Sequence, residues 1–230
     1  MQRLTCLQHL SNLHKLGNNI KKIVSFGDSY TFGHDLPDAS TAKFSQLTYV
    51  ALYANHLAVD YQCLAVGGSG TEGTCRRVFE TINELNESTL VVIMWPDSYR
   101  REIHTEKGWT QIGLPNEFSS EFEKIYYREM LFDNKWMNYL GLKDMLVAQE
   151  LLKNKNIPYV FLAVKDDLEQ LIHTDHPLSR LIDKTRWLTV YKDRGFDMWA
   201  KDVLRDTNPG HPGVEPHRLL FENLKGKYEN

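Results

Sequence analysis

The sequence contains little cysteine, has no long apolar run, and carries no large surplus of either charge. Its three cysteines, Cys6, Cys63 and Cys75, are an odd number without motif spacing. They therefore argue against a disulfide framework or a zinc site and favour reduced thiols in a protein made in the cytosol. No apolar run approaches the roughly 20 residues that a membrane-spanning helix needs, so we predict neither a transmembrane segment nor a membrane partner. With 27 basic and 30 acidic side chains the net charge is −3, which gives no support for a nucleic-acid partner.

The N-terminus also lacks the apolar core of a secretory signal peptide. Leucines recur every three residues from Leu4 to Leu16, with polar residues between them. This spacing predicts a one-faced helix over residues 1–20 that precedes the main domain. We expect this extension to dock on the domain or to mediate self-association, and we expect the protein to be cytoplasmic or virion-associated.

Residues 21–230 have the pattern of one α/β domain. Short stretches rich in Val, Ile, Leu and aromatic residues predict buried strands at 22–26, 59–66, 90–95 and 158–164, with a weaker fifth at 187–190. Helical periodicity covers 44–56, 74–85, 118–153 and 215–224, the third with a break near 138–141. Alternating strands and helices predict a mostly parallel sheet of about five strands with helices on both faces, a three-layer α/β/α sandwich.

A serine stands at the carboxyl end of the first predicted strand, in the stretch Gly27-Asp28-Ser29. Ligands of parallel sheets bind beyond the carboxyl ends of the strands. A serine hydroxyl becomes a nucleophile when a histidine takes its proton and a carboxylate orients that histidine. His211 lies in a loop stiffened by proline and glycine, just before the last predicted helix. We therefore expect Ser29 and His211 to meet.

Two blocks at opposite ends of the chain strengthen this hypothesis. The segments FGDSYTFG and NPGHPGVEPHRLLFENL resemble the first and last blocks of the SGNH (GDSL-type) hydrolase superfamily. The resemblance spans about residues 21–225. It implies a flavodoxin-like fold and, without any cofactor, hydrolysis of a small ester such as an acetylated glycan. By position, Ser29 would be the nucleophile and an oxyanion donor, Gly68 in CLAVGGSG a second donor, and His211 the general base.

The third block departs from the family pattern. The family has an asparagine there as an oxyanion donor, whereas this sequence reads IMWPDSYRRE and offers Pro96 or Asp97. Proline has no N–H and a carboxylate repels negative charge, and losing one such donor costs about 3–4 kcal/mol of transition-state stabilisation. Arg100 or Ser98 compensates if its side chain points inward. The stretch from Trp95 loosely resembles a version in some members, several of them viral, which suggests a viral or phage-type member.

The residue that orients His211 has two candidates. The family has an aspartate three residues before the histidine, where this sequence has Asn208. The nearest upstream carboxylate is Asp206, five residues before the histidine. An asparagine can hold an imidazole but cannot balance its positive charge, and this exchange can cost about 10⁴ in rate. We therefore favour Asp206 and keep Asn208 as the alternative.

Two alternative functions are compatible with the sequence. The altered third block and Asn208 suggest a non-catalytic protein of the same fold that binds glycans or serves as a virion component. Gly68, Gly70 and Gly73 also match a dinucleotide-binding fingerprint, with Asp97 as the ribose-binding acid. A structural interpretation of the same glycines is a tight turn between a strand and a helix.

Other polar residues have a structural and a functional interpretation. The cluster His173, Asp175 and His176 supplies either metal ligands or solvated surface side chains. Asp28 is expected to bond loop amides behind the serine. His217 is expected to pack or to cap the last helix and not to react.

Overall fold

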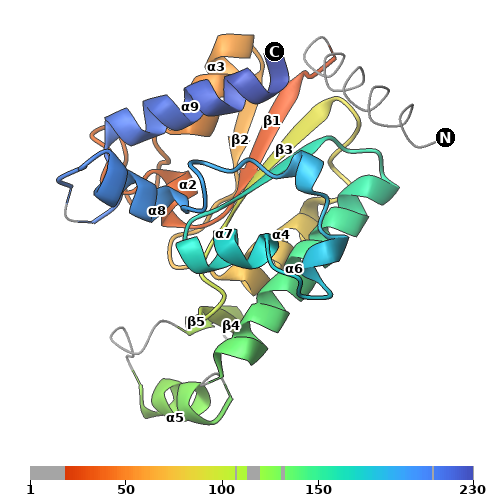
Figure 1. The fold of residues 1–230 in the computed structure, drawn as a ribbon, viewed down its shortest axis with the longest axis vertical. Helices are drawn as coiled ribbons and strands as arrows, with labels where there is room; N and C mark the ends of the chain where they lie inside the picture. Colours follow the sequence, from red (N-terminus) through yellow and green to blue (C-terminus); the bar gives the residue numbers. More distant parts are fainter. Residues whose placement is uncertain (1–18, 107, 113–119, 131–132, 209, 230) are drawn as a thin grey trace.

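A parallel sheet lies at the centre of the protein (Figure 1). The computed structural model describes residues 19–106, 108–112, 120–130, 133–208 and 210–229. Within these residues the central sheet has the strand order β2-β1-β3-β6. Its strands are β1 (Lys22–Phe26), β2 (Asp60–Cys63), β3 (Thr89–Trp95) and β6 (Tyr159–Ala163). Each neighbouring pair is parallel, so the carboxyl ends of all the strands lie along one edge.

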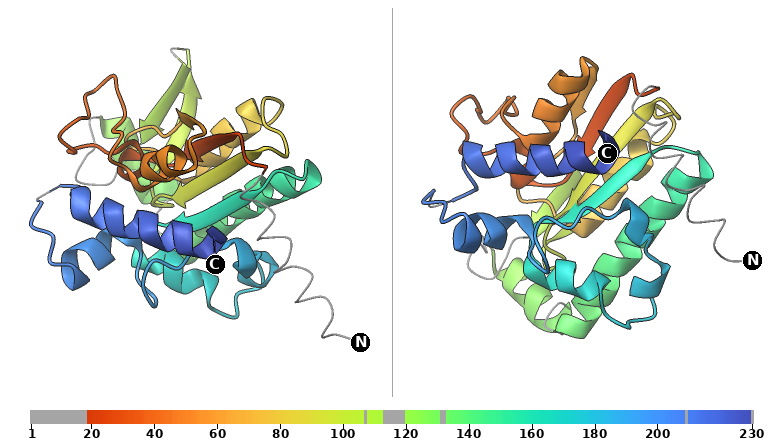
Figure 2. Two further views of the ribbon diagram at one scale, coloured as in Figure 1. Left: turned by 90° about the horizontal axis from the view of Figure 1, so that it is seen from above. Right: turned by 45° about the horizontal axis from the view of Figure 1, so that its top comes forward.

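Helices cover both faces of this sheet, which confirms the predicted α/β architecture (Figures 1 and 2). On one face, α3 (Tyr49–Leu57) packs beside α9 (Val214–Glu229). On the other, α4 (Thr71–Thr81) packs beside α6 (Asn134–Asn154). Every residue of β3 is buried, because its side chains alternate between the two covered faces. This double burial explains why the strand is an uninterrupted apolar run in the sequence.

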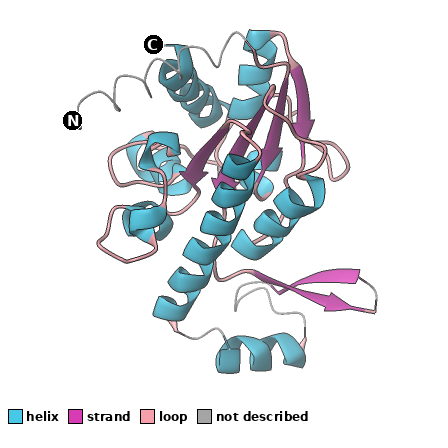
Figure 3. Cartoon of the chain, turned by 90° about the vertical axis from the view of Figure 1, so that its right-hand side faces the viewer, coloured by secondary structure: helices cyan, strands magenta, loops and turns pink. Residues whose placement is uncertain are grey.

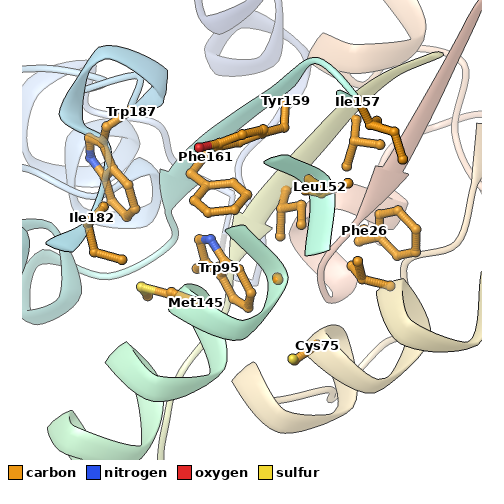
Figure 4. Close-up of a cluster of buried hydrophobic side chains, with 14 of the residues drawn as sticks. Phe26, Cys75, Trp95, Met145, Leu152, Ile157, Tyr159, Phe161, Ile182 and Trp187 are labelled. Atoms are coloured by element: carbon orange, nitrogen blue, oxygen red, sulfur yellow. The ribbon is translucent and has the colours of Figure 1, made fainter. Parts of the chain in front are cut away.

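The core on the α4–α6 face is built around aromatic side chains (Figure 4). The rings of Trp95 and Phe161 meet edge to face, with 5.3 Å between their centroids. Met145 and Leu152 pack on this cluster from α6, and Cys75 packs on it from α4. Burial raises the pKa of the Cys75 thiol to about 12, which keeps the thiol protonated at neutral pH.

A segment inserted between β3 and α6 projects from the body of the domain (Figure 3). It begins with an antiparallel hairpin of β4 (Arg101–Thr105) and β5 (Gly108–Ile112), and α5 (Glu121–Met130) follows. Ion pairs made by two buried hairpin residues, Arg101 and Glu102, anchor the hairpin to the main helices. Arg101 lies 3.1 Å from Glu72 and 3.3 Å from Asp144, and Glu102 lies 2.8 Å from Arg76. The start of the insertion is therefore fixed beside the carboxyl edge of the sheet.

Short helices complete the described part of the chain. They are α2 (Ser29–Phe32), α7 (Asp166–Ile172), the 3₁₀ turns Ser179–Leu181 and Lys184–Arg186, α8 (Phe196–Met198) and a π-helical turn at Trp199–Val203. None of the helices that the structure describes combines the length and the apolar character needed to cross a bilayer.

The observed elements correct three predictions. The expected fifth strand at 187–190 is a single bridge between Trp187 and Phe161 in the described chain. The expected break near 138–141 is absent, and α6 runs on through it. Gly141 packs closely there, because a Cβ on it would lie 3.1 Å from the Cβ of Ser98. The N-terminal helix expected over residues 1–20 lies almost entirely outside the described residues.

Candidate active site

The nucleophile candidate Ser29 is the first residue of the short helix α2, directly after the carboxyl end of β1. Gly27 makes this junction possible: its φ is +149°, and a Cβ on it would lie 2.8 Å from the carbonyl oxygen of Met94 in β3. Asp28 caps the helix by accepting a hydrogen bond from the N–H of Tyr30 at 3.0 Å. The N–H of Ser29 is a first-turn group without an intrahelical acceptor, so it is a donor that a ligand can use.

Ser29 and His211 meet across the carboxyl edge of the sheet. The distance from Ser29 Oγ to His211 Nε2 is 2.8 Å, which is a hydrogen bond between residues 182 positions apart. The Ser29 side chain is buried, whereas about a quarter of the His211 side chain is exposed. A proton can therefore pass between the two groups at a place that a substrate can reach from the solvent.

The carboxylate beside His211 belongs to Asp35, which the sequence did not reveal. Asp35 Oδ2 lies 2.7 Å from His211 Nδ1, and the backbone N–H of His211 donates to the same oxygen at 3.4 Å. The hydrogen bond to His211 lowers the pKa of Asp35, so the carboxylate is ionised at neutral pH. Serine, imidazole and carboxylate thus form one chain of hydrogen bonds.

A sharp turn after α2 brings Asp35 back to the serine. Gly33 ends the helix with φ +80°, and Asp35 itself has φ +69°, a left-handed conformation that aspartate tolerates. The carbonyl of Ser29 accepts hydrogen bonds from the N–H groups of Gly33 and His34. Gly210 makes room on the opposite side, because Asp35 Oδ2 occupies the position that a Cβ on Gly210 would take.

The prediction that Asp206 contacts His211 is wrong, and so is the alternative Asn208. Asp206 Oδ2 accepts a hydrogen bond of 2.6 Å from the N–H of Gly213. The Asn208 amide also faces Gly213, where a Cβ would lie 2.8 Å from Asn208 Nδ2. Both side chains therefore close the loop that carries His211 and do not contact its ring.

Aromatic side chains hold the imidazole from two sides. The ring of Tyr30 meets His211 edge to face at 4.8 Å, and the ring of His34 does so at 5.9 Å. Burial, followed by the charge of Asp197, raises the pKa of the Tyr30 hydroxyl and keeps it neutral. Partial burial and the charge of His211 lower the pKa of His34, which favours a neutral second imidazole at the site.

The predicted oxyanion donor Gly68 lies in a turn tied to the same strand end. The N–H of Val66 donates to the carbonyl of Gly27 at 3.1 Å, and the N–H of Ser69 donates to Val66 at 3.1 Å. Gly68 has φ +77°, which favours glycine. The buried guanidinium of Arg77 fixes this turn by donating to Ser69 Oγ at 2.6 Å and to the Gly27 carbonyl at 3.4 Å.

The third-block position offers no side-chain hydrogen-bond donor. Pro96 has no N–H, and the Asp97 side chain accepts a hydrogen bond of 2.8 Å from the N–H of Tyr99. Burial raises the pKa of Asp97, and the ionised form of its carboxyl repels an oxyanion. Ser98 is buried and packs against Gly141 of α6. Among the residues that sequence reasoning offered as a substitute, Arg100 is therefore the one left to consider.

Arg100 pairs with Asp28, the residue directly before the nucleophile. Arg100 Nη1 lies 3.8 Å from Asp28 Oδ2. Asp28 is fully buried, and this burial raises its pKa to about 6 even though Arg100 lowers it.

The alternative interpretations of two motifs find no support in the geometry. At the glycine fingerprint, the Arg100 carbonyl fills the space over Gly70 and the Glu102 carboxylate fills the space over Gly73, where a pyrophosphate would have to approach. In the histidine cluster, each side chain has a protein partner: His173 contacts Glu169, Asp175 contacts Arg180, and His176 accepts from the N–H of Leu178. Within the described residues, no three metal-ligating side chains gather to hold an ion.

A surface hollow of about 300 Å³ borders the proposed acid. It is lined by His34, Asp35, Leu36, Ala39, Ser40 and Thr41. The hollow gives a small ligand room beside Asp35, the residue that contacts His211.

Comparisons with solved structures show similar folds among esterases and lipases. The lipase Lip_vut3 from a goat rumen metagenome has a TM-score of 0.54 and 12% identity, covering 90% of this chain and 97% of that one. The esterase EstA from Pseudoalteromonas has a TM-score of 0.52 and 11% identity, covering 90% and 96%. The acetyl xylan esterase Est2A from Butyrivibrio proteoclasticus has a TM-score of 0.53 and 11% identity, covering 89% of this chain and 62% of that one.

These likenesses identify the fold of this chain as that of the G-D-S-L (SGNH-type) lipolytic esterases. A member of that family from Veillonella parvula matches with a TM-score of 0.50 and 14% identity over 89% of this chain and 96% of that one. No family model matches the sequence, and neither does any curated protein. The named structures come from bacteria or a rumen metagenome, so they give no support to the interpretation as a viral or phage-type member.

Proposed function

We propose that this protein is a serine ester hydrolase in which Ser29 is the nucleophile, His211 the general base and Asp35 the orienting acid. The observation that supports the proposal most directly is the continuous chain of hydrogen bonds from Ser29 Oγ through His211 to Asp35, at 2.8 and 2.7 Å. Such a chain is the arrangement that activates a serine hydroxyl. Its position at the carboxyl edge of a parallel sheet agrees with the general location of ligand sites in such folds.

The proposed reaction has two steps. Ser29 Oγ attacks the acyl carbon while His211 Nε2 takes the hydroxyl proton, and the carbonyl oxygen becomes an oxyanion. When the tetrahedral intermediate collapses, the bond to the alcohol breaks and His211 returns the proton to the leaving oxygen. Water then attacks the acyl-serine by the same proton transfers and releases the acid. The N–H groups of Ser29 and Gly68 are the backbone donors proposed for the oxyanion.

The proposed substrate is a small ester, with an O-acetylated carbohydrate as the favoured class. Support comes from the modest hollow of about 300 Å³ beside Asp35, which suits a small group better than a long acyl chain. The acetyl xylan esterase among the structures with a similar fold makes a carbohydrate ester a reasonable first substrate to test.

Turnover of p-nitrophenyl acetate by the wild type, Ser29→Ala and Ser88→Ala tests the proposal. Ser88 is a partly exposed serine bonded to Asn86 near the start of β3, so its variant controls for the loss of a hydroxyl. We expect Ser29→Ala to lose at least about 10⁴-fold in kcat while Ser88→Ala stays at the wild-type rate. A Ser29→Ala variant as active as the wild type would refute the role of Ser29. Labelling with diethyl p-nitrophenyl phosphate, followed by peptide mapping, should place the phosphoryl group on Ser29.

A non-catalytic glycan-binding role is the second candidate. The observation that favours it is the third-block position, where Asp97 and Pro96 provide no side-chain donor for an oxyanion. A wild-type protein that neither turns over acetyl esters nor reacts with the phosphate ester, but binds glycans on an array, would favour this candidate.

A further inference from the structure

We propose that the Arg100 guanidinium is a catalytic donor that stabilises the oxyanion in place of the missing asparagine amide. The inference rests on the proposed ester hydrolysis and adds a residue to it. Two backbone N–H groups would otherwise face the developing charge alone, since Asp97 accepts a hydrogen bond instead of donating one.

The side chain of Arg100 is directed toward the nucleophile's own segment. A short turn, closed by the hydrogen bond from the N–H of Tyr99 to Asp97, follows the end of β3, and Arg100 Nη1 then lies 3.8 Å from Asp28 Oδ2. Asp28 and Ser29 are consecutive residues, so the guanidinium lies beside the turn that carries the nucleophilic hydroxyl.

The backbone of Arg100 is fixed against the second oxyanion loop. Its carbonyl oxygen lies so close to the Cα of Gly70 that no Cβ fits there. The next residue, Arg101, is held by Glu72 at 3.1 Å and by Asp144 at 3.3 Å. Arg100 is thus placed between the turn that carries Ser29 and the turn that carries Gly68, the two proposed sources of backbone donors.

The surroundings strengthen the charge of Arg100. Only 17% of its side chain is exposed, so water screens the guanidinium weakly while still reaching it. Burial raises the pKa of Asp28, of Asp97 and of Tyr30, and the positive charge of Arg100 opposes that rise in all three, so its field reaches the groups around the nucleophile.

In this proposal Arg100 acts only on the charged tetrahedral intermediate. As Ser29 Oγ forms its bond to the acyl carbon, the electron pair of the carbonyl double bond moves onto oxygen, and His211 holds the proton. Arg100 donates a hydrogen bond to that oxygen and keeps its own protons throughout, because a guanidinium does not deprotonate in proteins. A charged donor forms a stronger hydrogen bond to an oxyanion than a neutral amide does.

The experiment compares Arg100→Met, which removes the donor, with Arg100→Lys, which keeps a positive charge. We expect kcat for p-nitrophenyl acetate to fall about 10²–10³-fold in Arg100→Met with KM changed little, and to fall less in Arg100→Lys. The rate of Ser29 modification by diethyl p-nitrophenyl phosphate, which also forms a charged transition state, should fall in parallel. Arg180→Met, at an exposed arginine far along the chain, controls for loss of a surface charge.

A merely structural role as the counter-charge of Asp28 makes a different prediction. In the Asp28→Asn background the Asp28 carboxylate is gone, so an effect of Arg100→Met that comes from this ion pair would disappear there. The proposal instead predicts that Arg100→Met lowers kcat by the same factor in that background, within about threefold. Added guanidinium ion should also restore part of the kcat lost in Arg100→Ala.

The outcomes separate this inference from the proposed function. Loss of activity in Ser29→Ala together with wild-type kcat in Arg100→Met would overturn the role of Arg100 and leave the esterase proposal standing. An effect that vanishes in the Asp28→Asn background would also overturn it. A wild-type protein without esterase activity would overturn both.

Discussion

The contact between Asp35 and His211 differs from a buried acid–imidazole pair because it is open to water. The Asp35 side chain is 58% exposed, and that of His211 is 24% exposed. Solvent screens such a pair and reduces its electrostatic contribution. We therefore expect Asp35 to act mainly by fixing the tautomer and the orientation of the ring, so that Nε2 faces Ser29.

Replacing each of the two candidate acids by alanine gives a direct prediction. Asp35→Ala should lower kcat by about 10²-fold or more, because His211 then loses the group that orients it. Asp206→Ala should keep kcat within about threefold of the wild type but lower the Tm, since the N–H of Gly213 loses its acceptor. Initial rates with p-nitrophenyl acetate and thermal unfolding of both variants measure these effects. The opposite ranking of the two kcat values would restore Asp206 as the functional acid.

Two of the three linked side chains were predictable from the sequence, and the third was not. Ser29 follows an apolar strand and His211 precedes a helix in a stiff loop, so local patterns mark both. Asp35 follows Ser29 by six residues, and its place depends on the turn at Gly33 and on the fit of its carboxylate over Gly210. The presence of Asn208 where an acid was expected was the available hint that the carboxylate comes from elsewhere.

The last helix, α9, is attached to α3 through a buried histidine. Tyr49, the first residue of α3, donates its N–H to His217 Nδ1 at 3.4 Å. The rings of Tyr49 and His217 stack with 6.1 Å between centroids, and Phe196 meets the histidine edge to face at 5.0 Å. Burial, and to a smaller extent the charge of His211, lowers the pKa of His217 to about 3.

This depressed pKa predicts acid sensitivity of the helix pair. As the pH falls below about 6.5, the unfolded chain binds a proton at His217 while the folded chain stays neutral, so the free energy of unfolding falls. Between pH 6.5 and pH 5 the wild type should lose about 1.6 kcal/mol that His217→Gln does not lose. Urea unfolding of both proteins across this pH range measures the difference. His173→Gln, at a partly exposed histidine, is the matched control, and equal pH slopes for wild type and His217→Gln would contradict the prediction.

Among the segments, the central strands were predictable and the hairpin was not. The strands at 22–26 and 90–95 are continuous apolar runs because both faces of the sheet are covered. The hairpin β4–β5 contains the charged residues Arg101 and Glu102, so its sequence lacks the apolar pattern by which a strand is predicted. Those charges are buried only because α4 and α6 supply partners, such as Arg76 and Asp144, from distant parts of the sequence.

The domain as a unit is organised around a sheet with one apolar cluster on each face. Consecutive residues of β3 enter opposite clusters: Val91 contributes to the cluster under α4 and α6, and Val92 to the one under α3 and α9. Both side chains are fully buried. A strand shared in this way couples the two layers, so neither cluster can open without exposing the sheet.

We expect Val91→Ala and Val92→Ala to destabilise the same cooperative transition. Each removes two buried methyl groups and leaves a small cavity, at a cost of about 2–3 kcal/mol. Thermal unfolding followed by far-UV and near-UV circular dichroism should show coincident midpoints in each variant, shifted by a similar amount. Separate transitions for the two probes, or a shift in one variant only, would mean that the layers unfold independently.

The fold class followed from the sequence because α/β alternation constrains the chain strongly. Short strands separated by amphipathic helices leave few arrangements other than a parallel sheet between two helical layers. The number of strands was overestimated because Trp187 touches β6 at a single bridge, and the apolar composition of 187–190 serves packing instead of strand pairing.

The placement of Asp35 close to Ser29 in the chain has a consequence for biosynthesis. During synthesis Ser29 and Asp35 leave the ribosome almost together, whereas His211 follows 176 residues after Asp35. Under the proposed mechanism, Ser29 therefore stays an unactivated alcohol until α9 packs on α3 and His211 reaches the site.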